Sequence, residues 1–576
     1  MSTSSFDYVI VGGGLAGLVL AARLSEDANI EVFVIEAGED QTADPRVTIP
    51  GMWPTLIRSE SAWNFSTVPQ EGLQNREIGF PLGKLLGGSS ALNGLSFSAT
   101  SKTNVDAWEG LGNPGWGWSR FVKSMKKSYT LGDAECPTGG PIQLSAPEDD
   151  SEWPDVWKRT IESLGFPTTG GTLDGEFSGS AVALDAVQPA TKQRSYSANA
   201  AEAEKILFDT SNKTVATGVQ LTKDGETKIV NARKEVIVTA GTINSPKLLE
   251  LSGVGHAALL KSVGIDVVID NPNVGENLQN HPMCTFNFEV RDEEGFDTID
   301  KLARQDGGAI AAAMDAYSKQ KGPFSKSGAN LIAQLPTPRV ETGGNTSELV
   351  KLLRSTILEN QQKPKSFEEY HEAFVHSVLS SPTEASGCYL AIPGYAGATG
   401  DGWMAPTPAG DEKYLTITLL LAHPLSRGSV HLNASPSGAK ILAIDPKYLT
   451  HPLDVEVMAR HLQVVEKIAS TEPLASHLKL DGKRSPSAPP YGSFADLDVA
   501  KDYLHKTAIG AHHFTGTCSM MPQELGGVVD AQLRVYGCQN LRVCDASIIP
   551  ITPRTNPQAT VYGVAEHAAA IIKSGL

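Results

Sequence analysis

The chain has 576 residues, of which 40% are hydrophobic and 20% are charged, a composition typical of a large globular protein. Its 48 basic and 65 acidic residues give a formal net charge of −17. Because no long basic run occurs, this balance argues against nucleic acid as a partner. No run of about 18 apolar residues is present either, so we expect no membrane-spanning helix.

The chain ends and the cysteines bear on location. Residues 1–5 (MSTSS) lead directly into an apolar run, without the basic and hydrophobic regions of a secretory signal, so we expect a cytoplasmic protein that is not secreted. Residues 574–576 (SGL) loosely match the S-K-L address, which leaves a peroxisomal location as the alternative. None of the six cysteines has C-x-x-C spacing, so we expect free thiols and no metal site.

Residues 7–17 (DYVIVGGGLAG) predict a strand, a glycine turn and a helix. Gly12, Gly14 and Gly17 fit the G-x-G-x-x-G pattern, in which the glycines allow a tight turn, a close pyrophosphate and close helix–strand packing. Leu15 and Ala16 begin the predicted helix, where free N–H groups favour a phosphate.

A second apolar run, residues 32–35, ends in Glu36, which lies 19 residues after Gly17. Dinucleotide-binding folds place an acid there for the adenosine ribose hydroxyls. The alternative is a glycine-rich turn between two core elements, but the order of strand, turn, helix, strand and acid favours a dinucleotide site.

Residues 83–94 (GKLLGGSSALNG) predict a glycine–serine turn before a short helix. Gly88 and Ser89 would offer backbone N–H groups and a hydroxyl to a second phosphate. The alternative is a helix capped by serine, but the phosphate cradle is favoured beside a dinucleotide fold. Residues 106–189 are rich in Gly, Pro and Trp, and we expect a loop-rich cover there.

The middle of the chain changes character. Residues 235–241 predict a buried strand, and Pro246 is expected at the first position of a helix that runs to Leu251. Alternating runs at 284–290 and 414–420 predict strands of an antiparallel sheet. A further helix is expected from Leu453 to about Ser470.

Near the C-terminus the motifs are dense again. Residues 509–521 contain the run His-x-x-Gly-Thr-Cys at His513. Residues 541–547 predict a strand that ends in Asp545 and Ala546, and residues 555–560 (TNPQAT) open a helix to Lys573.

Together these stretches resemble the glucose–methanol–choline (GMC) flavoprotein oxidoreductases of the His–Asn active-site type, over most of the chain. The resemblance implies an α/β, Rossmann-like FAD-binding domain that is discontinuous, and an α+β substrate domain with an antiparallel sheet of about six strands. We assign residues 1–105, 190–282 and 505–576 to the FAD-binding domain, 106–189 to the cover, and 283–504 to the substrate domain.

The resemblance also implies an enzyme that oxidises a primary or secondary alcohol. His513 would take the hydroxyl proton and Asn556 would hold the same oxygen, while a hydride passes to flavin N5 and the electrons go on to O2 or another acceptor. An imidazole suits the base role because its ordinary pKa lies near neutrality. Further FAD contacts are expected from Gly88, Ser89, Asn93, Gly94, Leu95, Ala203, Asp545, Ala546, Pro557 and Gln558.

Other residues of these motifs have simpler alternatives. His512 either lines the pocket or makes a structural hydrogen bond, and Asn556 could also cap the following helix. Phe97, Trp63 and Phe514 are candidate pocket walls or core residues. We expect Cys518 to pack as a small apolar side chain.

Two departures from the family pattern matter. The linker at 200–204 is short, and it contains the expected adenine contact Ala203. No His or Cys lies between Gly79 and Gly94, where some members attach FAD, so we expect non-covalent FAD. Two other functions stay open: a non-redox flavoprotein, either lyase or cyclase, and a light-driven flavin decarboxylase. No motif names the substrate.

Overall fold

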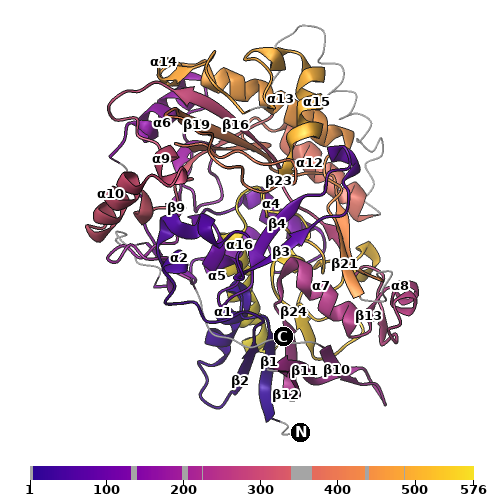
Figure 1. Cartoon of the computed structure of the whole chain (residues 1–576). Helices are drawn as coiled ribbons and strands as arrows, with labels where there is room; N and C mark the ends of the chain where they lie inside the picture. The colour runs from indigo at the N-terminus through magenta and orange to yellow at the C-terminus, as the bar shows by residue number, and fades with distance from the viewer. Residues whose placement is uncertain are drawn as a thin grey trace.

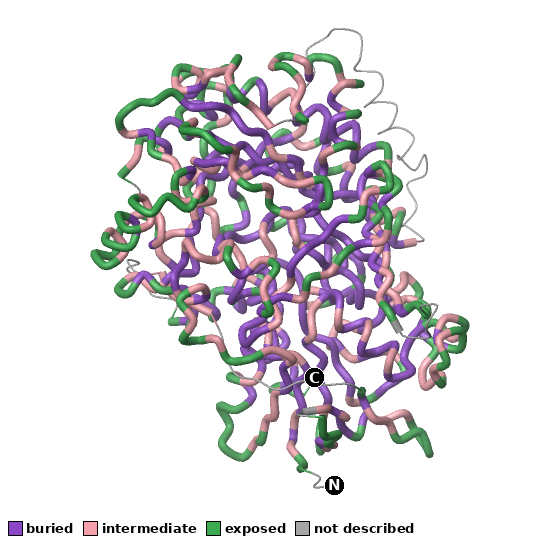
Figure 2. The backbone as a smooth tube through the Cα atoms, viewed as in Figure 1, coloured by how far each residue is buried: buried purple, intermediate pink, exposed green. Residues whose placement is uncertain are grey.

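The computed structural model describes residues 4–131, 139–148, 150–196, 205–223, 225–338, 366–434, 440–485 and 487–575. The chain forms two sheets stacked along the long axis of the molecule, with both termini at the end that carries the first sheet (Figure 1). Buried backbone runs continuously through the middle, between and within these sheets (Figure 2). No helix among the described residues is long and apolar enough to cross a membrane.

The first sheet gathers strands from three distant parts of the chain. Its order is β10-β11-β12-β1-β2, and β24 pairs with the C-terminal end of β12, on the edge away from β1. The strands are β1 (Ser4–Val11), β2 (Val32–Ile35), β10 (Lys205–Asp209), β11 (Val215–Lys223), β12 (Glu226–Val238) and β24 (Leu541–Val543). Strands β1, β2, β12 and β24 are parallel, as their continuous apolar runs predict.

Helices pack on this sheet, and two of them begin at the carboxyl ends of its parallel strands. Helix α1 (Leu15–Leu24) connects β1 to β2, and α16 (Gln558–Ser574) packs on α1 and on α5 (Trp118–Met125). Helix α7 (Gly241–Leu251) follows β12 directly. Consequently the N-terminal ends of α1 and α7 both lie at the carboxyl ends of parallel strands, where α/β folds bind ligands.

The second sheet is antiparallel and has seven strands, two of them only two residues long. Its order is β22-β16-β19-β18-β17-β8, and β23 pairs with β16. The strands are β8 (Gly179–Val182), β16 (Pro282–Val290), β17 (Leu331–Leu335), β18 (Gly387–Ile392), β19 (Lys413–Leu421), β22 (Leu478–Lys479) and β23 (Ile509–Gly510).

Side chains alternate between the two faces of this sheet. On one face Phe286 contacts the Tyr503 ring at a centroid distance of 5.3 Å. Tyr503 belongs to α15 (Leu497–Thr507), which packs beside α13 (Pro452–Ala469) over the sheet. The opposite face looks toward the first sheet, so it is free to line a site between the two.

Two boundaries differ from the sequence prediction. The expected cover at 106–189 is not only loop, because it holds α5 and α6 (Trp153–Ser163) and supplies β8 to the antiparallel sheet. Strands β20 (Gly428–Ala434) and β21 (Lys440–Asp445) form a separate sheet with β15 (Glu276–Leu278). That sheet packs on α7 of the FAD-binding part, where buried Glu250 accepts the Leu432 N–H at 2.7 Å.

The prediction that Pro246 starts a helix was wrong: α7 begins at Gly241 and contains Pro246. Proline lacks an N–H, so the carbonyl of Thr242, four residues earlier, loses its helical partner. The Thr517 hydroxyl donates to that carbonyl at 2.6 Å. A long-range hydrogen bond therefore replaces the local one, which a sequence pattern does not show. By contrast, α13 and α16 match their predicted spans closely.

The remaining elements are short or peripheral. They are α2 (Pro45–Thr48), η1 (Pro50–Leu56), β3 (Ala62–Ser66), η2 (Glu71–Leu73), β4 (Gly79–Gly83), α3 (Ser89–Leu92), β5 (Ser96–Phe97), α4 (Lys102–Gly110), β6 (Tyr129–Leu131), β7 (Ile142–Leu144), β9 (Leu184–Asp185), β13 (Val254–Gly255), α8 (Ala257–Ser262), β14 (Ile269–Asp270), α9 (Asp300–Ala303), α10 (Gly307–Ser318), η3 (Pro323–Ser325), α12 (Phe367–Ser380), α14 (Leu474–His477), η4 (Ser493–Ala495), η5 (Gln523–Leu525) and η6 (Ala546–Ile548).

Candidate active site

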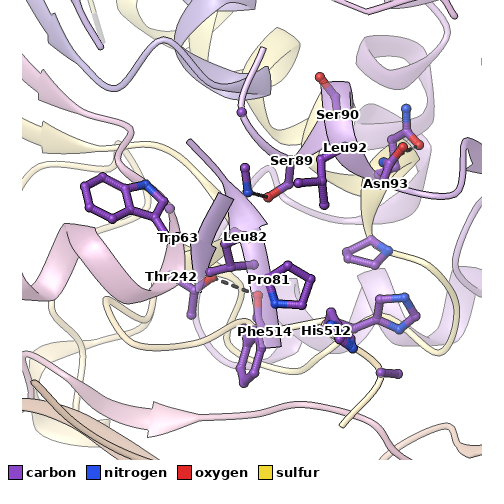
Figure 3. Close-up of a pocket in the computed structure, with 18 of the residues that line it drawn as sticks. Trp63, Pro81, Leu82, Ser89, Ser90, Leu92, Asn93, Thr242, His512 and Phe514 are labelled. Atoms are coloured by element: carbon purple, nitrogen blue, oxygen red, sulfur yellow. Dashed lines mark hydrogen bonds between the residues drawn. The ribbon is translucent and has the colours of Figure 1, made fainter. Parts of the chain in front are cut away.

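A cavity of about 710 Å³ lies between the two sheets. It takes its walls from both glycine turns, from the start of α7, from the cavity-facing side of the antiparallel sheet and from the C-terminal His513 segment. Figure 3 shows part of it, with Trp63, Leu82 and Phe514 among the lining residues and the Thr242 hydroxyl donating to the Phe514 carbonyl at 2.8 Å. The motifs that are far apart in the sequence thus meet around one space.

The first glycine turn has the geometry that its pattern predicts. Gly12 has φ +116, and a Cβ there would overlap the Thr239 carbonyl. A Cβ on Gly17 would overlap the Gly12 carbonyl, so only glycine allows this helix–strand contact. Gly14 is different, since its Cβ would meet only the Gly88 Cα, at 3.9 Å. Gly14, Leu15 and Ala16 line the cavity, whereas Gly17 does not.

The second glycine turn lies directly against the first. The Gly87 N–H donates to the Gly13 carbonyl at 2.9 Å. Gly88 and Ser89 line the cavity, and the Ser89 Oγ accepts the Gly83 N–H at 3.1 Å. The two predicted phosphate cradles therefore face the same space.

Glu36 and Asp545 are buried carboxylates at the cavity wall, and backbone amides hold both. Glu36 accepts the Gly13 N–H at 2.7 Å and the Gly38 N–H at 3.0 Å. Asp545 accepts the Gly241 N–H at 2.9 Å and the Ser245 hydroxyl at 2.6 Å. Both acids thus fix the turns at the start of α1 and α7, and Ala546 lines the cavity beside Asp545.

Asn93 connects the second glycine turn to the C-terminal segment. Its Nδ2 donates to Gln558 Oε1 at 2.9 Å, at the start of α16. Its Oδ1 accepts from the Leu95 N–H and from Arg194 Nη1, both at 3.0 Å. Arg194, a residue that the sequence reasoning missed, is buried and also donates to the Asn93 and Ser90 carbonyls. These contacts set the backbone around Asn93 rigidly at the cavity wall, which Gly94, Leu95, Pro557 and Gln558 also line.

His513 sits in a row of three polar side chains. Its Nε2 lies 3.1 Å from Asn556 Nδ2, and its Nδ1 lies 2.9 Å from His281 Nδ1. The His513 N–H donates to Asn280 Oδ1 at 2.8 Å, which fixes the backbone. His281 and Asn280 precede β16, and the sequence reasoning did not single them out. In the sequence, residues 274–282 (VGENLQNHP) have only the glycine and proline typical of a loop.

Burial keeps these imidazoles neutral. It places the pKa of His513 well below the usual value, and the neighbouring His281 and His512 add to that effect. Burial also lowers the pKa of His281 to about 4, despite nearby carbonyls of Pro553 and Ala422. With Asn556 Nδ2 as donor, the hydrogen-bond network assigns the lone pair of His513 to Nε2 and its proton to Nδ1. The basic nitrogen therefore lies beside Asn556, at the cavity wall.

His512 lines the cavity, which favours the first of its two predicted roles. Its φ of 63 lies in the left-handed region, a strained conformation for histidine. Within the part of the chain that the structure describes, its side chain has no hydrogen bond. Burial lowers the pKa of His512 to about 4.

Among the predicted aromatic walls, Trp63 and Phe514 line the cavity and Phe97 does not. Phe97 is fully buried and packs edge-on against Tyr129 at a centroid distance of 5.4 Å, so of its two predicted roles the structure favours that of a core residue. Cys518 is fully buried, as expected. Ala203 lies outside the described residues.

The comparisons with known proteins agree with this geometry. The family profile for GMC oxidoreductases matches residues 6–283 with its N-terminal part and residues 424–565 with its C-terminal part. Dehydrogenase citC of Monascus ruber is 33% identical over 617 residues of alignment, covering 99% of this chain and 96% of that protein. A dehydrogenase of Armillaria gallica is 34% identical over 624 residues, covering 100% and 94%.

The chain belongs to the GMC oxidoreductase family.

Solved structures of related enzymes have the same fold as this chain. Formate oxidase has a TM-score of 0.84 at 28% identity, covering 100% of this chain and 99% of that one. An FAD-dependent oxidoreductase from Chaetomium thermophilum has a TM-score of 0.84 at 25% identity, covering 99% of both chains. This GMC oxidoreductase is accordingly an FAD-dependent enzyme, and the predicted family, fold class and cofactor are confirmed.

The residues present fit FAD. The two glycine turns meet with room left at Gly14. Helix α1 starts there without a side-chain cap among the described residues, so its first N–H groups can bind a phosphate. Glu36 presents a carboxylate at the end of β2, where a ribose hydroxyl would donate to it. In the described residues no group of three or more His, Cys, Asp or Glu side chains is placed to hold a metal ion.

Several residues that line the cavity of this GMC oxidoreductase were not predicted from the sequence. Trp53 precedes the first β-hairpin, and Trp403 belongs to a loop before β19. Thr285 and Thr418 come from the antiparallel sheet. The alternating pattern at 284–290 and 414–420 predicted the strands, but it did not show which face meets the cavity.

Proposed function

We propose that this GMC oxidoreductase oxidises an uncharged primary or secondary alcohol to the carbonyl compound, with His513 as the base. The observation that carries the proposal is the neutral imidazole of His513, with its Nε2 3.1 Å from Asn556 Nδ2 at the wall of the FAD-sized cavity. An alcohol oxygen on the cavity side, within reach of both groups, would replace their mutual contact: it would donate its proton to His513 Nε2 and accept a hydrogen bond from Asn556 Nδ2.

The cofactor would be held at the other end of the same cavity. We assign the pyrophosphate to the two glycine turns, through Gly14, Leu15, Ala16, Gly88 and Ser89, and the adenosine ribose to Glu36. When bound, FAD supplies the acceptor for the two electrons and the hydrogen removed from the substrate carbon. Asn93, Gly94, Leu95, Ala546, Pro557 and Gln558 would surround its ring end and ribityl chain, with Asp545 fixing their turns.

The remaining proton is handled by the protein. His513 Nε2 takes it from the hydroxyl, and the positive charge that forms on the ring is shared with the Nδ1–H, which points to His281 Nδ1 at 2.9 Å. Because burial keeps His281 neutral, its lone pair is available to accept that hydrogen bond. His281 is thus a positioning residue: it fixes the tautomer and the orientation of the base.

The alternative of a small anionic substrate has less support. Formate oxidase shares the fold, but anion binding needs a cationic partner at the reacting end. Of the described lining residues, Lys247 is the one cation, and it lies 5.9 Å from the Trp63 ring, in the wall formed by α7. The imidazoles beside the reacting position have pKa values well below their usual range. An uncharged alcohol fits these neutral donors and acceptors.

Non-covalent FAD is part of this proposal, because residues 79–94 contain no His or Cys and the cavity wall there is made of Gly, Ser, Leu and Asn. Acid precipitation should release all the yellow colour into the supernatant, since no bond would hold the flavin once the protein unfolds. A yellow pellet after repeated washing would contradict this prediction.

Anaerobic mixing of the holoenzyme with aryl, aliphatic and sugar alcohols tests the function itself. At least one alcohol should bleach the oxidised flavin band in a single turnover, and formate should not. If no alcohol bleaches the band although FAD is bound, the proposed reaction is wrong. Peroxide formation in air, compared with dye reduction, then distinguishes O2 from another acceptor.

A further inference from the structure

One face of the antiparallel sheet forms a wall of the cavity, which we call the ceiling. Alternate residues of its three central strands line the space: Met283 and Thr285 of β16, Thr418 and Leu420 of β19, and Leu390 and Ile392 of β18. The spacing of two within each strand is what one face of a sheet requires. Four of these six side chains are apolar, and the two threonines are the exceptions.

The two threonines lie side by side. Thr285 and Thr418 are directly paired across β16 and β19 in the antiparallel register. Directly opposite residues place their Cβ atoms about 5 Å apart, so one small group can reach both hydroxyls. Thr418 is only 4% exposed, and Thr285 is half-buried. In the described portion of the chain, neither hydroxyl has a hydrogen-bond partner.

The next polar pair on the same face behaves differently. Asn287 and Thr416 are also directly paired, two residues farther along each strand. Asn287 Nδ2 donates to Thr416 Oγ1 at 2.7 Å, and Thr416 Oγ1 donates to the Gly394 carbonyl at 2.6 Å. That pair is satisfied by the protein, whereas the Thr285–Thr418 pair is open to the cavity. Because both threonines line the cavity, a molecule bound there can supply the partner that a buried polar group such as Thr418 normally has.

The surroundings of the open pair limit what that partner is. The charged lining residues among those described are Glu36, Lys247 and Asp545, and all three belong to the FAD-binding part. Trp53 and Trp403 add aromatic walls, and Trp53 packs 3.7 Å from where a Gly94 Cβ would stand. A charged group at the ceiling would be buried without a counter-ion, which is costly.

The Thr285–Thr418 pair lies on the same face of the sheet as Met283, which follows His281 in the chain. His281, which contacts His513, lies just before β16, and Met283 is the first ceiling residue of that strand. Thr285 lies two residues beyond Met283, roughly 7 Å farther along the strand. A substrate that reaches from His513 to the threonine pair therefore extends along the sheet past Met283.

We propose that Thr285 and Thr418 bind a second oxygen of the substrate, so that the enzyme selects uncharged, ring-containing alcohols that carry an ether, hydroxyl or carbonyl oxygen across the ring from the reacting carbon. This inference rests on the proposed function for the identity of the reacting group. The hydroxyls would donate to that oxygen, and the aromatic and aliphatic walls would bind the ring.

Equilibrium binding tests the threonine pair without turnover. The probes are 4-methoxybenzamide and 4-ethylbenzamide, neutral molecules of similar shape that cannot be oxidised as alcohols, repeated as the 3-substituted pair. Dissociation constants come from the change in flavin absorption of the oxidised holoenzyme. The wild-type enzyme should bind the methoxy member of at least one pair about tenfold more tightly, the usual worth of a hydrogen bond.

Substitutions then locate the selectivity. T285V/T418V should reduce that preference to about onefold, and T285S/T418S, which keeps both hydroxyls, should retain it. The matched control is T222V/T227V, a threonine pair directly opposed on β11 and β12, outside the cavity lining. The control should preserve the preference.

Two results would overturn the inference: no methoxy preference in the wild-type enzyme, or a preference that survives in T285V/T418V with full FAD content. A variant that does not fold is replaced by the single substitutions T285V and T418V, each of which should weaken the preference. If benzamide selectivity behaves as expected while no alcohol bleaches the flavin, the proposed reaction fails and the binding inference stands.

Discussion

At the scale of single residues, the chemistry depends on which atoms meet at His513. The sequence predicted His513 and Asn556 as a pair, because the family pattern carries both, and the structure places their side chains within 3.1 Å. His281 could not be predicted in the same way. It becomes a neighbour of His513 because Pro282, the first residue of β16, pairs with Gly510, the last residue of β23.

Substitution of Asn556 tests its proposed role in holding the substrate oxygen. Asn556→Leu removes the donor that would stabilise the developing charge on oxygen, so flavin reduction should slow by about 10²-fold. Asn556→His restores a donor and should recover most of that loss. Rapid-mixing measurements of both variants under anaerobic conditions provide the comparison. Equal rates in Asn556→Leu and wild type would remove Asn556 from the mechanism.

At the scale of elements, the first glycine turn performs two separable tasks. Gly12 and Gly17 let the β1–α1 corner close, and Gly14 leaves room at the point where the second turn arrives. The sequence predicted these tasks from spacing alone, because steric needs repeat wherever a strand meets a helix in this way. It did not predict the start of α7, which a hydrogen bond from distant Thr517 makes possible.

Gly12→Ala and Gly14→Ala separate folding from cofactor binding. The added Cβ at Gly12 would overlap the Thr239 carbonyl at a positive φ, so Gly12→Ala should express poorly or unfold at a much lower temperature. At Gly14 the nearest atom is 3.9 Å away, so Gly14→Ala should fold but bind FAD at least tenfold more weakly. Thermal midpoints and flavin titration distinguish them. The reverse pattern would contradict the assigned roles.

At the scale of the whole molecule, two sheets from interleaved segments enclose one cavity. The discontinuous arrangement was predictable from the family resemblance, and the continuous apolar strands near both ends of the chain, with alternating strands between them, agreed with it. The limits of the substrate part were not. Strands β20 and β21 pack on α7 through Glu250, and β8 extends the antiparallel sheet from the expected cover, both by contacts between residues distant in sequence.

Buried histidines couple the stability of this whole structure to pH. Burial lowers the pKa to about 4 for His281, His512 and His567 and to about 3 for His423 and His461. The unfolded chain takes up these protons near pH 6.5, and the folded chain does so only at lower pH. Stability is therefore fully present above about pH 6.5 and is lost as the pH falls through 4 toward 3.

We expect the stability of the folded protein to fall steeply as the pH is lowered. Each such histidine contributes up to about 1.4 kcal/mol of lost stability per pH unit below 6.5. The thermal midpoint of the holoenzyme should therefore fall markedly between pH 7.5 and pH 5.5, with loss of bound FAD. Differential scanning calorimetry at constant ionic strength measures it. A midpoint that stays constant down to pH 5 would show that these side chains do not titrate on unfolding.

The most direct test of the central claim is the rate of anaerobic flavin reduction in His513→Ala, with the best alcohol found for the wild-type enzyme. Loss of the base should slow this step by about 10²–10⁴-fold. FAD content and thermal midpoint should remain near wild type, since Gly14 and Glu36 at the cofactor end are untouched. A loss smaller than tenfold, in a variant that binds FAD fully, would contradict the assignment of His513 as the base that takes the alcohol proton.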